Sequence, residues 1–97
     1  MAVAVQIDYP DFALEQYNEV VESLGLLPGG PAPHGDLFHV VLQVDNGIRI
    51  IDVWESKDAY EQFRETRVAP ILKEMGVVDL SHRQFFDVHN YFTARRA

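Results

Sequence analysis

The stretch that decides the fold is "VVLQVDNGIRIIDVWES", residues 40–56. Its Asn46-Gly47 pair is the strongest short-range signal for a β-hairpin. The pair joins a strand that runs from Leu37 to Val44 to a second strand that runs from Ile48 to Glu55. Ser56 follows as a good N-cap residue for a helix. The stretch therefore predicts a hairpin that leads directly into a helix.

The residues before the hairpin predict a strand, a helix and a loop. Three apolar residues alternate with Ala4, Gln6 and Asp8, which is the pattern of a strand with one apolar face: Val3, Val5 and Ile7. Pro10 stops this strand, Asp11 is a suitable N-cap for a helix, and Gly25 is placed as its C-terminal stop. Residues 26–35 contain three prolines and three glycines, so we expect a loop.

The residues after the hairpin predict a second helix and a fourth strand. Tyr60 and Phe63 are the first apolar contacts of that helix. Pro70 lacks a backbone N–H, so the helix should kink or restart before Val68, and Gly76 should end it. The segment from Gln84 to Thr93 is rich in Phe, Val and Tyr and reads as a strand.

This order of elements, βαββαβ, is the ferredoxin-like arrangement, an α+β fold. Right-handed crossovers place both helices on one face of a four-stranded antiparallel sheet with the spatial order 4-1-3-2. At 97 residues, of which 47% are hydrophobic, the chain has the size of one domain, residues 1–97. The other face of the sheet is left uncovered.

Composition and charge narrow the function classes. The net charge of −7 repels nucleic acid and anionic lipid alike. No apolar run approaches the ~20 residues that span a bilayer. The first residues have neither a basic region nor a cleavage site, and the chain has no cysteine. We therefore expect a cytoplasmic protein that binds neither nucleic acid nor membrane.

The hairpin turn also predicts which side chains share a face. If Asn46 and Gly47 form the turn, His39 opposes Trp54 and Val41 opposes Asp52. One face then carries the apolar set that we assign to the side packed by helices: Val40, Leu42, Ile51 and Val53. The other face carries a mixed set that we assign to the uncovered side: His39, Val41, Gln43, Ile50, Asp52 and Trp54.

The outer strands extend this assignment. With Val3, Val5 and Ile7 toward the helices, Gln6 and Asp8 join the uncovered face. From the last strand, that face gains Phe85, Asp87, His89 and Tyr91 if Phe86 and Val88 face the helices. A bulge would bring in Asn90 instead of His89 and Tyr91. An apolar patch of this size needs a cover, and a second copy of the chain supplies one, so we expect a homodimer through the sheet face.

The pattern resembles the dimeric α/β-barrel superfamily, which includes antibiotic-biosynthesis monooxygenases, small polyketide cyclases, muconolactone isomerases and haem-degrading enzymes. The matching features are the element order, "DVWES" at residues 52–56, Phe63, Pro70 before Ile71-Leu72, and "VHN" at residues 88–90. The resemblance implies a dimer with a ligand cavity between sheet and helices, or at the sheet interface. It also implies oxygen chemistry without a metal or flavin.

Two departures from this superfamily refine the expectation. Haem-binding members hold iron with a histidine on the second helix, and residues 57–75 contain no histidine, so we expect no haem. Oxygenase members often pair an asparagine late in the first strand with a tryptophan such as Trp54. Here that neighbourhood offers Gln6 and Asp8.

His39, Asp52 and His89 are the candidate catalytic residues. An imidazole beside an aromatic wall can take a proton from an acidic carbon or a phenol near neutral pH. The alternative for His39 is a structural histidine at the sheet interface. Asp52 could orient a histidine, or it could pair with Arg49 or Arg83 across the dimer.

The candidate substrate-binding residues are Gln43, Trp54, Tyr91, Asn90, Phe85 and His34. Trp54 is expected to form a wall that stacks on flat substrates. His89 and Tyr91 could hold an enolate oxygen, or they could belong to an ordinary aromatic strand. His34 lies in the Gly-Pro loop, which could act as a lid. We expect no metal at His39, Asp52 and His89, because strand four lies roughly 9.6 Å from strand three.

Two functions are compatible with these residues. The first is an enzyme of the cofactor-independent monooxygenase or cyclase type that acts on an aromatic or polyketide-like molecule in a cavity on the sheet face. The second is a non-catalytic dimer that binds a small ligand or contributes to a stress response. In the first function a histidine removes a proton, and in the second the polar cluster only stabilises the interface.

Overall fold

The structure is a computed structural model, and it describes residues 1–93. The strands are β1 (Val3–Pro10), β2 (Asp36–Val44), β3 (Gly47–Trp54) and β4 (His82–Asp87). The helical segments are α1 (Leu14–Ser23), α2 (Lys57–Phe63), the π-helical segment η1 (Arg64–Val68) and α3 (Ala69–Glu74). No helix within residues 1–93 combines the length and the apolar character needed to cross a bilayer.

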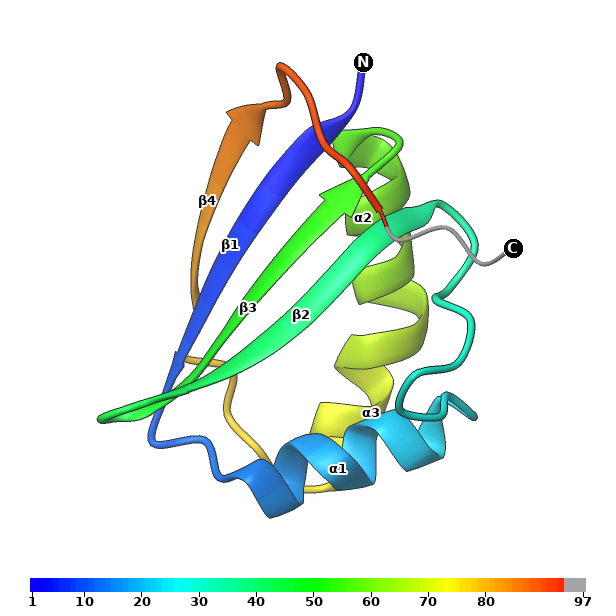
Figure 1. Ribbon diagram of the computed structural model, residues 1–97. Helices are drawn as coiled ribbons and strands as arrows, with labels where there is room; N and C mark the ends of the chain where they lie inside the picture. Colours follow the sequence, from blue (N-terminus) through cyan, green and yellow to red (C-terminus); the bar gives the residue numbers. More distant parts are fainter. Residues whose placement is uncertain (94–97) are drawn as a thin grey trace.

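The four strands form one antiparallel sheet with the order β2-β3-β1-β4. Both helical stretches lie on the same side of this sheet, and the opposite side is left without a helix (Figure 1). The element order, the spatial order of the strands and the one-sided helix layer agree with the sequence-based prediction. The α+β, ferredoxin-like fold is therefore confirmed.

Local signals place most helix ends as predicted. The Ser56 side chain accepts a hydrogen bond from the N–H of Ala59 at 3.0 Å, as an N-cap does. Gly25 and Gly76 have φ of +75° and +72° just beyond α1 and α3, where a residue with a Cβ would be strained. The prediction for Asp11 is wrong, because Asp11 lies in a turn with φ of +58° and Ala13 is the N-cap of α1.

The break expected before Pro70 takes the form of a π-helical segment. The N–H of Ala69 reaches the carbonyl of Arg64, five residues back, so the backbone widens just before the proline. Pro70 then sits in the first turn of α3, where its missing N–H leaves no hydrogen bond unmade.

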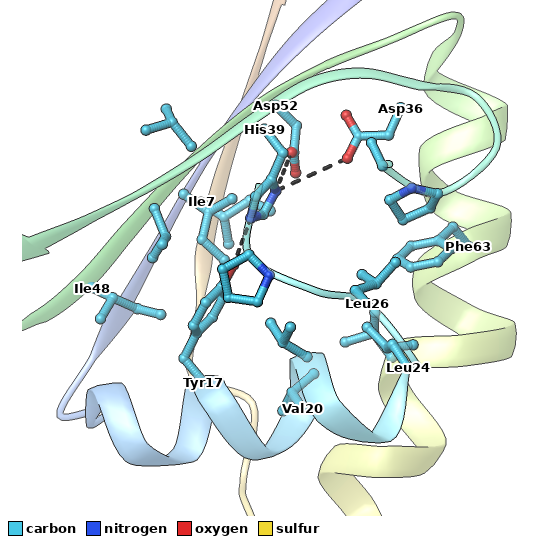
Figure 2. Close-up of a pocket in the computed structure, with 18 of the residues that line it drawn as sticks. Ile7, Tyr17, Val20, Leu24, Leu26, Asp36, His39, Ile48, Asp52 and Phe63 are labelled. Atoms are coloured by element: carbon cyan, nitrogen blue, oxygen red, sulfur yellow. Dashed lines mark hydrogen bonds and ion pairs between the residues drawn. The ribbon is translucent and has the colours of Figure 1, made fainter. Parts of the chain in front are cut away.

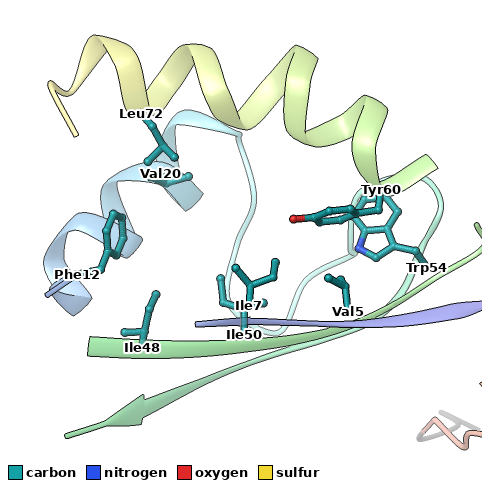
Figure 3. Close-up of a cluster of buried hydrophobic side chains, with 9 residues drawn as sticks. All are labelled: Val5, Ile7, Phe12, Val20, Ile48, Ile50, Trp54, Tyr60 and Leu72. Carbon is teal, nitrogen blue, oxygen red and sulfur yellow. The ribbon is translucent and has the colours of Figure 1, made fainter. Parts of the chain in front are cut away.

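The buried core fills the space between the sheet and the helices. Figure 3 shows its nine side chains: Val5, Ile7, Phe12, Val20, Ile48, Ile50, Trp54, Tyr60 and Leu72. Val5 and Ile7 face the helices as predicted. The prediction for the central hairpin is wrong, since Ile50, Asp52 and Trp54 lie under the helices, whereas Leu42 is 40% exposed on the uncovered side.

The hairpin register is also shifted by two residues from the prediction. Val44 pairs with Gly47, so Asp45 and Asn46 form the turn, and His39 opposes Asp52 instead of Trp54. Gly47 has φ of +147°, and a Cβ there would lie 2.0 Å from the carbonyl oxygen of Tyr9. This close approach to β1 fixes Gly47 inside the strand. A shift of two residues preserves the faces, so His39, Asp52 and Trp54 still share one.

The last strand is shorter than predicted, and its faces are reversed. β4 ends at Asp87, which pairs with Val3, the first residue of β1, so further residues have no strand to pair with. Phe85 opposes Val5 and points toward the helices, and Phe86 is 52% exposed on the uncovered side. His89, Asn90 and Tyr91 follow the strand instead of belonging to it.

Candidate functional site

A cavity of about 670 Å³ lies between the sheet and the helices. It is bordered by the sheet, by α1, by the helical stretch α2–η1–α3 and by the loop that joins α1 to β2 (Figure 2). Most of its lining is apolar, and the loop contributes Leu26, Leu27, Pro28, Gly29, Gly30, Pro31, Ala32 and Pro33. A cluster of four polar side chains lies at its wall: Tyr17, Asp36, His39 and Asp52. The cavity is thus on the helix side of the sheet, and the prediction that places it on the uncovered face is wrong.

His39 and Asp52 are joined by a short hydrogen bond at the cavity wall. They are directly opposite each other on β2 and β3, which puts their side chains on one face and within reach. The distance from Nδ1 of His39 to Oδ1 of Asp52 is 2.5 Å. Since a carboxylate only accepts, the bond fixes the imidazole with its proton on Nδ1 when the ring is neutral. The second ring nitrogen, Nε2, is then an acceptor.

Tyr17 occupies this second nitrogen. Its hydroxyl lies 2.7 Å from Nε2 of His39, and the two rings are nearly parallel, with an angle of 8° between their planes. Tyr17 is on α1, one turn before the buried Val20, so the helix packing brings the phenol over the sheet. The three side chains form a chain of hydrogen bonds, Asp52–His39–Tyr17 (Figure 2). Sequence reasoning missed Tyr17 because its spacing is that of an apolar core contact of the helix.

Asp36 is a second acid in the same place. It begins β2 opposite Trp54, beside a bulge between Asp36 and Phe38, and only 2% of its side chain is exposed. Its Oδ2 lies 4.0 Å from Nδ1 of His39, whereas its Oδ1 is buried and has no partner among residues 1–93. Gly35, with φ of +90°, turns the chain into this position. The sequence signal that could have found Asp36 is an acid directly after a glycine and before a strand.

Burial and mutual repulsion set the pKa values in this cluster. Burial, followed by the charge of Asp52, raises the pKa of Asp36 to about 8. Burial alone would lower the pKa of His39, but the hydrogen bond that its ring donates to Asp52 and the charges of Asp52 and Asp36 raise this pKa overall. Burial, with the charges of Asp52 and Asp36, also raises the pKa of Tyr17. The cluster therefore holds protons more tightly than isolated side chains do.

Trp54 closes one end of the cavity. Its ring is 1% exposed and packs against Tyr60 and Phe63 at centroid distances of 5.8 and 5.3 Å. The indole N–H is buried without an acceptor among residues 1–93. Such a donor costs roughly 1 to 3 kcal/mol when unpaired, which is why most find a partner. Trp54 is thus a wall of this cavity, and its stacking on a substrate stays a prediction.

The other predicted site residues lie elsewhere. His34, Gln43, His89, Asn90 and Tyr91 are exposed, and none of them lines the cavity. Phe85 packs against Tyr60, with its ring 4.6 Å from Nζ of Lys57, outside the cavity. Within the chain Arg49 pairs with Asp8, and Asp52 pairs with His39. The structure brings together only His39, Asp52 and Trp54 from the predicted set, and it adds Tyr17 and Asp36.

Comparison with known proteins agrees with the fold. No protein-family model and no curated protein sequence matches this chain. Among solved structures, SnoaB, a cofactor-independent oxygenase from Streptomyces nogalater, matches with a TM-score of 0.59 and 17% identity, covering 96% of this chain and 97% of that one. A conserved protein from Methanosarcina mazei matches with a TM-score of 0.58 and 15% identity over 89% of this chain and 91% of its own.

A third match is a protein from Deinococcus radiodurans that is provisionally assigned as an antibiotic biosynthesis monooxygenase. Its TM-score is 0.54, with 14% identity over 99% of this chain and 100% of its own. Near-complete coverage of both chains means that the likeness extends over the whole arrangement of helices and strands. The chain therefore shares the ferredoxin-like fold of these three proteins.

Proposed function

We propose that this protein is a cofactor-independent enzyme that removes a proton from a flat aromatic or polyketide-like molecule bound in the cavity. The observation that carries the proposal is the Asp52–His39–Tyr17 hydrogen-bond chain at the wall of an apolar cavity of about 670 Å³. Cavities that hold small molecules have volumes of roughly 300 to 1,000 Å³ and a few converging polar groups in an apolar lining. This cavity has both properties.

In the proposed reaction His39 is the base. Its proton on Nδ1 stays with Asp52, which orients the ring and stabilises the imidazolium that forms. The acidic group of the substrate takes the place of the Tyr17 hydroxyl at Nε2 and gives its proton to that nitrogen. The displaced hydroxyl of Tyr17 then donates to the oxygen of the enolate. The free indole N–H of Trp54 is a second donor at the same cavity.

The enolate supplies the electrons for the step that follows. With dioxygen, an activated methylene group loses its two hydrogens, one oxygen atom becomes the carbonyl of the product, and the other leaves in water. This step needs no metal or flavin, because the substrate itself is the reductant. The fold shared with an oxygenase of this type, SnoaB, supports oxygenation over the alternative, in which the carbanion attacks its own carbonyl and closes a ring.

One observation favours the second candidate, a non-catalytic binding protein. Both nitrogens of His39 already have hydrogen-bond partners, at 2.5 and 2.7 Å, so the histidine can be explained by structure alone. In that case Tyr17 stays in place when a ligand binds, and the cluster only ties α1 to the sheet.

The uncovered face of the sheet is the proposed homodimer interface. It carries Phe38, Leu42 and Phe86, which are 41%, 40% and 52% exposed in the single chain. Exposed aromatic residues on a sheet face are commonly covered by a partner. The catalytic cavity lies on the opposite side, so each subunit would hold its own site. We place the enzyme in the cytoplasm, because it has no cysteine and so needs no oxidising compartment.

Oxygen uptake with a panel of hydroxylated tricyclic anthrones tests the proposal. His39→Ala should bind the same anthrone, shown by quenching of Trp54 fluorescence, and should lower turnover at least ~10²-fold, the range for a lost general base. His82→Ala is the matched control, because His82 is exposed on β4 and outside the cavity. If the wild type binds an anthrone but neither consumes oxygen nor closes a ring, and His39→Ala binds it equally well, the result would favour the non-catalytic candidate.

A further inference from the structure

Asp36 has no part in the proposed proton transfer, although its side chain is more deeply buried than that of Asp52, with 2% exposed compared with 7%. We propose that Asp36, His39 and Asp52 form a binding site for a divalent first-row transition-metal ion, and that an ion bound there switches off His39 as a base. The binding site stands independently of the reaction, whereas the switch rests on the proposed function.

The positions of the three ligand atoms support the site. One nitrogen of His39 and one carboxylate oxygen each from Asp36 and Asp52 all lie within 4.8 Å of one another. Ligands around a tetrahedral ion with bonds of ~2.1 Å are about 3.4 Å apart. The distances from Nδ1 of His39 to Asp52 and to Asp36, 2.5 and 4.0 Å, lie on either side of that value. Side-chain movements of about an ångström would bring all three atoms to coordinating distance.

A second observation points to a ligand at this place. The Asp36 side chain is 2% exposed, and its Oδ1 has no partner among residues 1–93, so a buried carboxylate is only partly satisfied. Figure 2 shows this carboxylate and the His39–Asp52 pair together at the upper rim of the cavity. A carboxylate buried in this way is costly unless a proton, a cation or a hydrogen-bond donor satisfies it, and a bound cation would take the place of the proton.

The ligand set indicates the class of ion. One imidazole and two carboxylates suit Zn²⁺, Co²⁺, Mn²⁺ or Fe²⁺, whereas Mg²⁺ and Ca²⁺ prefer oxygen ligands alone. The charge of such an ion balances the two carboxylates. Because the cluster lines the cavity, a fourth coordination position can be taken by water or by an oxygen of a bound molecule.

Metal binding would change the tautomer of His39. Coordination at Nδ1 needs the lone pair of that nitrogen, so the ring proton must move to Nε2. Nε2 then donates to the oxygen of Tyr17, which is 2.7 Å away, and it can no longer accept a proton from the substrate. The same ion that satisfies Asp36 would thus remove the base from the reaction.

Titration calorimetry with ZnCl₂, and absorption spectroscopy with CoCl₂, test the site on the chelator-treated protein. We expect one ion per chain, and Asp36→Asn should weaken binding at least ~10²-fold, since even residues that only support a ligand contribute 10- to 100-fold. Asp45→Asn is the matched control, because it removes the same charge from the exposed hairpin turn. Mg²⁺ should not compete.

Equal Zn²⁺ affinity in Asp36→Asn and the wild type, or no binding to either, would overturn the site. Imidazole ¹⁵N NMR tests the tautomer without any substrate: Zn²⁺ should move the His39 proton from Nδ1 to Nε2, and an unchanged proton position overturns the switch. If a substrate is turned over, Zn²⁺ should inhibit the wild type reversibly and Asp36→Asn much less. If none is turned over, the proposed function fails while the binding result still decides the site.

Discussion

Replacing Asp36 by asparagine should make the metal-free protein more stable near neutral pH. In the folded chain the pKa of Asp36 is about 8, mainly because the group is buried and next because Asp52 repels its charge, compared with 3.8 for an unperturbed aspartate. The folded state therefore binds a proton at pH 7 that the unfolded state has lost, and stability falls as pH rises from about 4 to about 8. Asparagine has nearly the same shape and no charge to lose.

The size of the stability gain follows from how far pH 7 lies above the pKa of the unfolded group, because the folded group keeps its proton over that range. At pH 7 the unfolded group is about three units above its pKa, and each unit corresponds to ~1.4 kcal/mol, which gives an upper bound of about 4 kcal/mol. The neighbouring cavity is partly open to solvent, which screens part of this penalty. We therefore expect Asp36→Asn to gain up to about 4 kcal/mol of unfolding free energy at pH 7 and almost nothing at pH 4.

Urea unfolding followed by the fluorescence of Trp54, the sole tryptophan, measures this difference. The buffers contain EDTA so that no metal contributes to stability. Asp45→Asn, on the exposed turn, corrects for the change in net charge. A variant that is less stable than the wild type at pH 7, or a stability difference that does not change between pH 4 and pH 7, would refute the assignment of a buried, protonated acid.

Three further predictions concern packing and assembly. Gly35→Ala should lose about 1 to 3 kcal/mol in the same unfolding assay, because φ is +90° at this position, whereas the new Cβ would make only an ordinary contact of 3.5 Å with the Trp54 ring. A loss below ~0.5 kcal/mol would contradict the backbone strain. Ile48→Ala should lower the free energy of unfolding by about 2 to 5 kcal/mol, because Ile48 is a core residue that is 1% exposed. Val44→Ala should lower it much less, because Val44 is 37% exposed. Leu42→Lys should convert the proposed dimer to a monomer, as measured by light scattering. The unfolding free energy of the monomer should stay within ~0.5 kcal/mol of the value without the substitution. A dimer that persists in this variant would place the interface elsewhere.

The element order and the sheet topology could be predicted because strong local signals separate the segments. The presence of the hairpin, the Ser56 cap and the glycines after the helices are decided by neighbouring residues. The position of the turn itself was missed by one residue, since the close approach of Gly47 to Tyr9 depends on a strand almost 40 residues earlier. Contacts of that kind leave no local pattern.

The side of the sheet that holds the site could not be read from the hairpin. Both of its faces are apolar, with Val40 and Ile51 on one and Val41 and Ile50 on the other, so alternation cannot distinguish them. The register of β1 against β3 decides the question, because Val5 opposes Asp52 and brings that acid to the core side. The site residues that share a face were still found together, since the register error was an even number.

Tyr17 and Asp36 were missed for different reasons. Tyr17 has the spacing of a core residue on a helix, and its hydroxyl becomes informative only when His39 is known to lie beneath it. Asp36 falls at the boundary between a loop and a strand, where burial depends on the bulge that follows. Conversely, His89 and Tyr91 were expected on β4. This strand ends before them, at Asp87, because β1 begins at Val3 and offers no further residues to pair with.

The most direct test of the central claim measures proton removal by itself. An anthrone of the panel described above is incubated with the metal-free protein in D₂O without oxygen, and ¹H NMR follows the loss of its methylene signal as deuterium enters. We predict that the wild type accelerates this exchange over solvent and that His39→Ala loses at least ~10²-fold of the acceleration, while His82→Ala keeps it. Equal exchange rates for the wild type and His39→Ala would contradict the assignment of His39 as the base.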